Sequence, residues 1–395
     1  MKAMNPAQVA LQELQNHGVS KQRIDFLIAH SHSVITTFQE PNGALPASPT
    51  FSAYKGYAWL RDGAFTSEGL SRFGDVVNVN RYHDWVSGVL TARRGQVDEL
   101  IAKNRRGEEV PVSEMLPTRF TFEGMDGSDP WWDFQTDGYG MWIWAATTHA
   151  TRHGVDLAKW RTGLEVAFDF AAEFWERNCY DWWEEHIDQT HGSTLGALFA
   201  GFEAIGNGGV LDTARSARAQ ELAKAVQTYL LENAVTTGRA TDPIAPHLAK
   251  WVGNPAVDAS LAACITPFHA ISGESELAVN TIDAIERDLS FNFGVHRFAA
   301  DVFFGGGQWL LLSCLVGWNK AAAGDIKGAA AYFAWVTQQA LENGDMPEQV
   351  PGHLLHADHQ QRWIDKWGTV ATPLLWSHGM FLILADELGL ISKEN

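Results

Sequence analysis

The stretch DLAKWRTGLEVAFDFAAEF, residues 156–174, shows the pattern that decides the fold class. Its apolar side chains recur at steps of three and four residues, which places them on one face of an α-helix. These side chains are Leu157, Trp160, Leu164, Ala167, Ala171 and Phe174. Asp156 precedes them, where its carboxylate can accept a hydrogen bond from a free N–H group of the first turn. The stretch therefore predicts an amphipathic helix that begins after Asp156.

The same periodicity recurs along most of the chain. Asp212 opens a second predicted helix, whose apolar face holds Leu222, Val226, Tyr229 and Leu230. A third predicted helix ends at Gly344, and its apolar face holds Ala329, Tyr332, Phe333, Val336 and Ala340. Alternating strand patterns are scarce, and the connecting segments are rich in Gly, Pro, Asp and Trp. We therefore predict an all-α fold of about a dozen helices in antiparallel order.

The composition limits the classes of partner. The 395 residues are 46% hydrophobic and 19% charged, as in a globular protein with a large core. Lys and Arg number 29 and Asp and Glu number 47, which gives a formal net charge of −18. A surface this acidic repels phosphate backbones and anionic lipids. We expect neither nucleic acid nor membrane partners, and a neutral substrate fits better.

The N-terminus and the cysteines indicate the compartment. The segment MKAMNPAQVALQELQNHG mixes polar and apolar residues and lacks the continuous apolar stretch of a signal peptide. Cys179, Cys264 and Cys314 lie in apolar surroundings and are typical of reduced core residues. We therefore expect a cytoplasmic protein. No linker marks a boundary, so we expect one domain over 1–395, with 1–40 as a helical lead-in packed on it.

Two short acidic motifs carry most of the functional information. YDWWEEH (180–186) contains Glu184 and Glu185 beside a tryptophan pair, and GDMPEQV (344–350) contains Glu348. A carboxyl against an indole loses water, which raises its pKa and suits a general acid at neutral pH. A second, ionised carboxylate could then act as a base or as a nucleophile. Such a pair is the minimum machinery for cleaving a glycosidic bond.

Other segments supply further candidate residues. YAWLRDGAF (57–65) contains Tyr57, Trp59, Arg61 and Asp62, where the adjacent Arg and Asp could form a helix-start charge pair or bind sugar hydroxyls. Further candidates are Trp131, Arg297 and Trp309. The chain has 17 tryptophans, and those in loop-like segments suit a cleft lined with flat aromatic faces: Trp59, Trp131, Trp132, Trp182, Trp183, Trp363 and Trp367.

Taken in order, these segments resemble the glucoamylase family, glycoside hydrolase family 15. The motifs are WLRDGAF, DPWWDFQTDG, YDWWEE, HRF with GQW, MPEQ and PLLWSHGMF, and the resemblance extends from GALPASPTF (43–51) nearly to the end. It implies an (α/α)6 barrel with its cleft at one end. It also implies inverting hydrolysis that releases glucose from a non-reducing end. Among the members, the chain resembles compact bacterial isomaltose-type glucohydrolases.

The resemblance assigns roles to individual residues. Glu184 matches the general acid and Glu348 the general base, while Arg61 and Asp62 match the pair that grips the terminal glucose. Further matching cleft residues are Trp59, Trp131, Trp183, Arg297 and, near the next sugar, Glu185. Tyr57 and Trp309 complete the candidate substrate-binding set. The chain departs from the family at Lys55, where many members carry a tyrosine, and either Tyr54 or Tyr57 could take that role.

The first functional hypothesis is an inverting exo-α-glucosidase for short α-1,6-linked gluco-oligosaccharides, isomaltose above all. The chain has no room for the extra β-sandwich or starch-binding domains of many relatives, which favours short substrates over starch. Malto-oligosaccharides and trehalose are the alternative substrates. A non-catalytic sugar-binding protein is disfavoured because both Glu184 and Glu348 are retained. Epimerases and terpene cyclases need histidine-rich or DDxxD-like clusters that the sequence does not show.

No cofactor and no metal are expected. His149 and His153 share a helix face, and His353, His356 and His359 follow at three-residue steps, but neither set has the HExxH or cysteine pattern of a metal site. The GNGG and GGG stretches lack the lysine and serine of a phosphate-binding loop. Acidic loops and aromatic residues are compatible with a dimer without indicating one.

Overall fold

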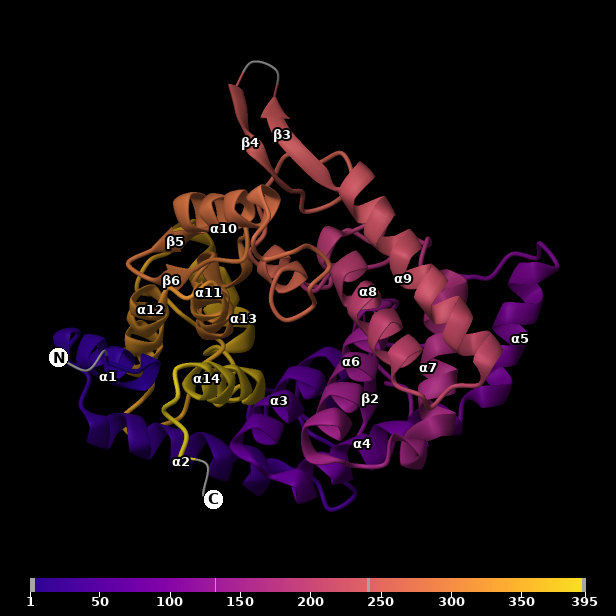
Figure 1. Cartoon of the computed structure of the whole chain (residues 1–395), viewed down its shortest axis with the longest axis horizontal. Coiled ribbons are helices and arrows are strands. Elements are labelled where there is room, and N and C mark those ends of the chain that lie inside the picture. The colour runs from indigo at the N-terminus through magenta and orange to yellow at the C-terminus, as the bar shows by residue number, and fades with distance from the viewer. Residues whose placement is uncertain (1–3, 132, 240–241, 393–395) are drawn as a thin grey trace.

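The computed structural model describes residues 4–131, 133–239 and 242–392, without the side chains of residues 238, 239 and 242–244. In this part of the chain the helices alternate between an outer and an inner ring (Figure 1). The inner ring is α3 (Leu60–Phe73), α6 (Asp137–His153), α8 (Gly192–Asn207), the 3₁₀ helix η3 (Ala259–Cys264), α11 (Leu310–Ala322) and α14 (Leu375–Glu387). The outer ring is α2 (Lys21–Phe38), α4 (Val76–Thr91), α7 (Arg161–Phe174), α9 (Thr213–Asn233), α10 (Glu276–Leu289) and α12 (Ile326–Gln339).

Each inner element packs against the next one, and α14 returns to α3, so the ring is closed. Each outer helix covers one inner element, with α2 on α14, α4 on α3 and α7 on α6. In the same way α9 covers α8, α10 covers η3 and α12 covers α11. The arrangement is the (α/α)6 barrel that the sequence predicts.

The two rings differ in how their residues are buried. In α8 and α14 nearly every residue is buried, as expected for helices that contact protein on all sides. In α9 only Ala219, Ala223, Val226 and Leu230 are fully buried, so one face meets the barrel and the other meets water. Inner helices approach closely where glycines meet: a Cβ on Gly140 of α6 would lie 2.4 Å from the Ala197 carbonyl oxygen of α8.

Two of the three predicted helix boundaries are confirmed, and one is wrong. α9 begins where predicted, and Asp212 accepts a hydrogen bond from the Arg215 N–H at 2.8 Å. The 156–174 stretch also begins where predicted, and Asp156 accepts a hydrogen bond from the Ala158 N–H at 3.0 Å. It divides into the 3₁₀ helix η2 (Leu157–Trp160) and α7, and at the junction the indole N–H of the buried Trp160 donates to Asp84. The prediction that the third helix ends at Gly344 is wrong: α12 ends at Gln339 and the chain continues extended through Ala340.

The strands are short and lie mostly in the connecting segments. β1 (Tyr57–Trp59) pairs with β2 (Arg119–Thr121), and a four-stranded sheet joins β5 (Ser290–Phe291), β6 (Gly294–Val295), β7 (Gln308–Trp309) and β8 (Gln349–Val350). β3 (Val235–Arg239) and β4 (Asp242–Leu248) form a hairpin that projects from the body in Figure 1. β1 and β7 lead directly into α3 and α11, so they fix the ends where these inner helices begin.

The remaining helices lie outside the two rings. α1 (Pro6–Asn16) packs on α12, and α5 (Arg94–Arg105) packs on α7. α13 (Gln360–Trp367) contacts the 3₁₀ helices η4 (Phe303–Gly305) and η5 (Ala357–His359), and a further 3₁₀ helix, η1, spans Val112–Glu114. Of the expected N-terminal lead-in, α2 is itself the first helix of the outer ring. Within the described ranges, no helix is both long and apolar enough to cross a membrane.

Candidate active site

The candidate site is a cavity of ≈ 630 Å³ at the end of the barrel where the inner helices begin. Most of the residues singled out in the sequence line it, although they come from segments far apart in the chain. They are Trp59, Arg61, Asp62, Trp131, Trp183, Glu184, Glu185, Arg297, Trp309 and Glu348. Its volume lies within the usual range for small-molecule sites. Tyr57 is the one candidate that does not line it.

Glu184 lies on a tight turn between Asp181 and α8, with a backbone φ of 64° that side-chain-bearing residues rarely adopt. The indole N–H of Trp59 donates to its Oε1 at 2.7 Å, and the indole N–H of Trp131 donates to its Oε2 at 2.7 Å. Burial raises the pKa of Glu184, while Arg61, 3.7 Å away, and the indole donors oppose the rise. The carboxyl is thus rigidly placed in a partly dehydrated setting.

Glu348 lies on the segment between α12 and β8, where its backbone N–H donates to the Ala371 carbonyl at 2.9 Å. The Tyr54 hydroxyl donates to its Oε1 at 2.9 Å, and its buried Oε2 has no hydrogen-bond partner among the described residues. Burial raises the pKa of Glu348 to about 7, although Tyr54 opposes the rise. Burial therefore raises the pKa of both glutamates, whereas the sequence suggested a raised value for the acid alone. The free Oε2 is the atom that could hold a water molecule.

Tyr54 and Tyr57 occupy different places, which the sequence left open. Tyr54 lines the cavity beside Glu348, and Lys55 is exposed. The Tyr57 hydroxyl donates to Asp129 at 2.6 Å, and its ring lies under the Arg119 guanidinium at 3.9 Å. Tyr54 is thus the tyrosine next to the candidate base, and Tyr57 supports the wall behind Trp59.

Arg61 and Asp62 lie in the first turn of α3 and are both buried. Arg61 donates through Nη1 to Gln135 at 2.5 Å and to Asp137 at 3.1 Å. Burial raises the pKa of Asp62 to about 7, and the neighbouring Arg61 charge opposes the rise. A fixed guanidinium beside a carboxyl suits several hydroxyls of one sugar ring. The sequence missed the support from Asp137, because an aspartate before a glycine usually indicates a turn.

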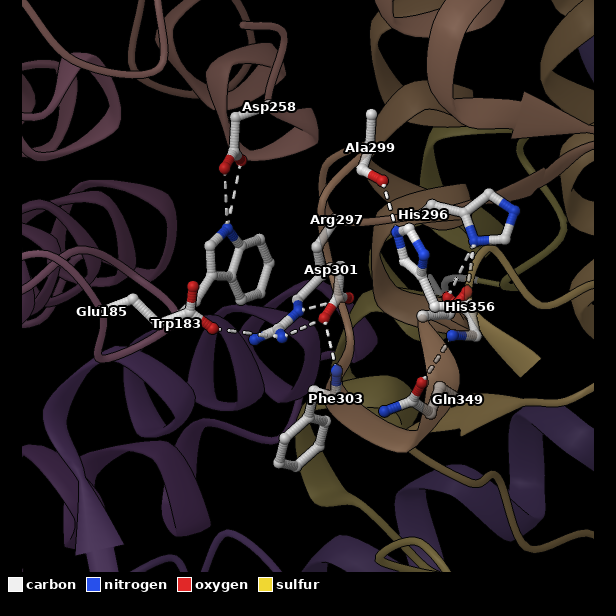
Figure 2. Close-up of polar contacts among 12 residues, drawn as sticks. Trp183, Glu185, Asp258, His296, Arg297, Ala299, Asp301, Phe303, Gln349 and His356 are labelled. Carbon is white, nitrogen blue, oxygen red and sulfur yellow. Dashed lines mark hydrogen bonds and ion pairs between the residues drawn. The ribbon is translucent and has the colours of Figure 1, made fainter. Parts of the chain in front are cut away.

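Arg297 lines the cavity and is held by a second polar network (Figure 2). Its Nε donates to Asp301 Oδ2 at 2.8 Å, its Nη2 donates to Asp301 Oδ1 at 2.5 Å, and the same Nη2 lies 3.4 Å from Glu185 Oε1. Asp301 also accepts the Phe303 backbone N–H at 2.9 Å. This network holds the Glu185 carboxylate at the cavity wall, one residue beyond the candidate acid.

The cavity is also lined by aromatic residues that the site set predicted from the sequence omits. They are Phe51, Phe303, Trp363, Trp367 and Trp376, with Lys366 beside Trp367. Trp363 stacks on Phe51 with ring centroids 5.8 Å apart and meets Phe303 edge-on at 5.3 Å. The high number of tryptophans was the feature of the sequence that indicated an aromatic cleft. The prediction that Trp363 and Trp367 lie in loops is wrong, because both lie on the helix α13. Trp132 lies outside the described residues.

The histidines that raised the question of a metal are held by other contacts. His149 is buried and its Nδ1 lies 2.8 Å from the Ser71 hydroxyl, while His153 contacts the Ser71 carbonyl. His353 lies 3.1 Å from His296, and His356 contacts the Ala299 carbonyl. In the part of the chain that the structure describes, no group of three or more His, Cys, Asp or Glu side chains is placed to hold a metal ion.

Solved structures and curated proteins resemble the chain closely. A solved structure described as "Glycosidase Wild Type" is 56% identical with a TM-score of 0.90, and covers 94% of this chain and 98% of that chain. A variant glycosidase solved "in complex with glucose" is 55% identical over the same shares, with a TM-score of 0.91. A bacterial glucoamylase complexed with acarbose is 18% identical with a TM-score of 0.68, covers 92% of this chain and 55% of that one, and shares the fold.

The curated isomaltose glucohydrolase of Kribbella flavida is 57% identical over 371 residues, which are 93% of this chain and 94% of that protein. The family model of the glycosyl hydrolases family 15 matches residues 21–364. The family match covers the whole outer ring, the inner ring except α14, and both candidate glutamates. The chain therefore belongs to glycosyl hydrolase family 15 and is a glycoside hydrolase.

Proposed function

We propose that the protein is an inverting exo-acting α-glucosidase that releases β-glucose from the non-reducing end of short α-1,6-linked gluco-oligosaccharides such as isomaltose. The observation that carries the proposal is the pair of glutamates, the partly buried Glu184 and the buried Glu348, on the wall of one cavity. One carboxyl is fixed by two indole donors and the other has a free oxygen. The choice of isomaltose rests on the name of the Kribbella relative.

The two carboxyls have complementary tasks in this reaction. Protonated Glu184 gives its proton to the glycosidic oxygen as the bond from that oxygen to C1 of the terminal glucose breaks. Ionised Glu348 takes a proton from a water molecule, whose oxygen bonds to C1 from the opposite face. One water is consumed and two sugars are released, the terminal one as β-glucose. A bound sugar displaces water from the cavity, which raises the pKa of Glu184 further and favours its acid form.

The cavity wall favours a short, neutral substrate. Arg61 and Asp62 bind the terminal glucose, and Trp59, Trp131, Trp183, Arg297 and Trp309 complete the wall around it. Glu185, held by Arg297, faces the next sugar. Phe51, Trp363 and Trp367 also line the cavity and occupy space that further sugar units of a longer chain would need. These contacts support a preference for disaccharides over polymers.

The same proposal extends to the organisation and setting of the protein. We infer one catalytic domain over 1–395, because the two rings of the barrel take helices from both ends of the described chain. We also infer a cytoplasmic setting. It is supported by Cys179, Cys264 and Cys314, which are free and buried thiols.

Proton NMR of the products tests the proposed reaction directly. With isomaltose, the glucose from the non-reducing end is expected as the β-anomer, because water attacks C1 opposite the leaving oxygen. The reducing-end glucose is already an anomeric mixture, so the early product is expected to contain more β-glucose than the equilibrium mixture. Maltose and trehalose in parallel tubes are expected to react more slowly. An early isomaltose product enriched in α-glucose would contradict the inverting mechanism, and faster release from maltose or trehalose would contradict the proposed linkage preference.

Replacing Tyr54 by phenylalanine is expected to move the acid limb of the pH profile. The Tyr54 hydroxyl stabilises ionised Glu348, so its loss raises the pKa of Glu348 above about 7. The base is then protonated at a higher pH, and the acid limb of kcat/KM moves upward. A hydrogen bond to a charged group contributes ~1.5–3 kcal/mol, which corresponds to a shift of about one to two pH units.

Tyr57→Phe is the matched control, because Tyr57 does not line the cavity and its hydroxyl donates to Asp129 and not to Glu348. We expect its pH profile to follow that of the wild type. The measurement is kcat/KM for isomaltose between about pH 4 and pH 9, which spans the pKa values raised in the cavity. An unmoved acid limb in Tyr54→Phe would show that Tyr54 does not control the ionisation of the base.

A further inference from the structure

Lys250 is a buried cation close to the active site that does not line the cavity. Only 4% of its side chain is exposed. Its ammonium lies 3.1 Å from Asp181 Oδ2 and 2.5 Å from Asp258 Oδ2, and 3.8 Å from the centre of the Phe298 ring. A buried ammonium is costly unless it is paired. This one is shared by two buried carboxylates that lie 77 residues apart in the chain, so it joins two segments.

Asp181 carries the turn on which Glu184 sits. Its Oδ1 accepts the backbone N–H groups of Trp183 and Glu185, both at 2.9 Å. Its carbonyl accepts the Glu184 N–H at 3.0 Å, and its own N–H donates to the Glu185 carbonyl at 3.0 Å. The turn holds positive φ angles at Glu184 (64°) and His186 (56°), which persist only where the surroundings enforce them. Asp181 supplies that enforcement.

Asp258 fixes the side chain of Trp183, the residue before Glu184. Both of its carboxylate oxygens accept the indole N–H of Trp183, at 2.9 and 3.2 Å (Figure 2). Its Oδ1 also accepts the backbone N–H and the hydroxyl of Ser260, at 2.9 and 2.6 Å. Asp258 is thus anchored to the start of η3, the short element of the inner ring, and Trp183 is anchored through it.

The charge of Lys250 offsets the repulsion between the two aspartates. Two buried carboxylates near one another repel, and without a cation between them Asp181 takes up a proton more readily. A protonated Asp181 would give up acceptor capacity that the turn uses. In the structure the pKa of Asp181 is lowered, with burial opposed mainly by the Lys250 charge. The ammonium therefore secures the hydrogen bonds of the turn that carries Glu184.

We propose that Lys250 is a positioning residue for glycoside hydrolysis: through Asp181 and Asp258 its ammonium holds the turn 181–186 so that the Glu184 carboxyl meets the glycosidic oxygen. The proposal rests on Glu184 acting as the general acid. Lys250 itself touches neither the substrate nor the reacting atoms. Its loss displaces the acid while leaving Glu348 and the Arg61–Asp62 pair in place, because these lie on other elements.

The test compares two substrates in Lys250→Met, which keeps the length of the side chain and removes its charge. Isomaltose needs a proton on its leaving oxygen, whereas α-glucosyl fluoride releases fluoride with little help from an acid. We expect kcat for isomaltose to fall by about 10- to 100-fold, because a small displacement of a catalytic group has effects of this size. For α-glucosyl fluoride we expect kcat within about threefold of the wild type and an almost unchanged KM, and for isomaltose a smaller change in KM than in kcat.

Two further variants separate the explanations. Lys320→Met is the matched control, since Lys320 pairs with Glu286 at 2.6 Å near the far end of α11, about 16 Å from Trp309 at 1.5 Å per residue. Lys320→Met is expected to leave kcat and KM for both substrates unchanged. Glu184→Gln is expected to show the same selective loss as Lys250→Met in stronger form. If kcat of Glu184→Gln falls equally for both substrates, the assignment of Glu184 as the acid fails. That outcome is distinct from failure of the Lys250 proposal.

Two results for Lys250→Met would overturn the proposal, provided that Glu184→Gln loses activity on isomaltose alone. The first is an equal fall in kcat for both substrates, and the second is an unchanged kcat for isomaltose. Thermal melts establish that each variant is folded at the assay temperature.

If Lys250→Met does not fold, Asp258→Asn replaces it. This variant keeps the size of the side chain and weakens the hold on Trp183, so a smaller loss with the same selectivity for isomaltose is expected. An equal loss on both substrates in Asp258→Asn would overturn the proposal.

Discussion

Glu184→Gln is expected to lower kcat for isomaltose by about 10²- to 10⁴-fold, the usual contribution of a general acid. Glutamine has no proton to give to the leaving oxygen. The two indole donors make the change visible in stability as well, because the Glu184 oxygens accept from Trp59 and from Trp131. The NH₂ group of glutamine is a donor and cannot accept a hydrogen bond, so one of the two indole N–H groups loses this acceptor at a cost of up to ~3 kcal/mol.

Kinetics with isomaltose and α-glucosyl fluoride, together with a thermal melt, measure both effects. Glu185→Gln provides the matched control, because it makes the same chemical change at the next residue. Glu185 is held at the cavity wall by Arg297, so we expect its variant to raise KM more than it lowers kcat. Near-normal turnover of isomaltose by Glu184→Gln would contradict the acid assignment, as would a larger kcat loss in Glu185→Gln.

The fold could be predicted only partly from periodicity. Outer helices such as α9 show an apolar face, so pattern alone locates them. Inner helices such as α14 are apolar nearly all round and buried nearly all round, so no stripe indicates which neighbour each face meets. The inner element η3 is a six-residue 3₁₀ helix, which is too short to carry a helical pattern. The ring of six therefore came from the resemblance to the family.

The site residues were predictable where a motif places them and not where distant segments meet. The carboxylates of Glu184 and Glu348 were identified from their motifs, and both line the cavity. Tyr57 belongs to the same sequence segment as Trp59, but it lies two residues earlier on β1 and does not line the cavity. Its hydroxyl donates to Asp129 and its ring contacts Arg119. Tyr54 reaches Glu348 across 294 residues of chain.

Lys250 shows the same limit more sharply. Its partner Asp181 lies 69 residues away, and the segment between them includes two helices of the barrel. Nothing in the local sequence of a lysine next to a tryptophan distinguishes a buried cation from a surface charge. Only the closure of the barrel brings η3 against the turn that carries Glu184, and with it the two aspartates that Lys250 pairs.

Glu348→Ala is expected to lose about 10²- to 10⁴-fold in kcat on both isomaltose and α-glucosyl fluoride. The reason is that the attacking water must give up a proton whichever group leaves, and the Oε2 atom that would receive it is removed. The fall in kcat for both substrates distinguishes Glu348→Ala from Glu184→Gln, which is expected to lose activity on isomaltose alone. Glu348→Gln keeps the size of the side chain and is expected to be equally inactive, which separates the lost base from the space left by alanine.

Azide then reports the face of attack. It is a nucleophile that needs no base, and the space vacated in Glu348→Ala lies on the side from which the water is proposed to come. Sodium azide is therefore expected to restore turnover of α-glucosyl fluoride in this variant, with β-glucosyl azide as the product identified by NMR. In Glu348→Gln the amide still fills that space, so we expect little rescue. An α-glucosyl azide product would place the attack on the same face as the leaving group and would contradict the assignment of Glu348 as the base of an inverting enzyme.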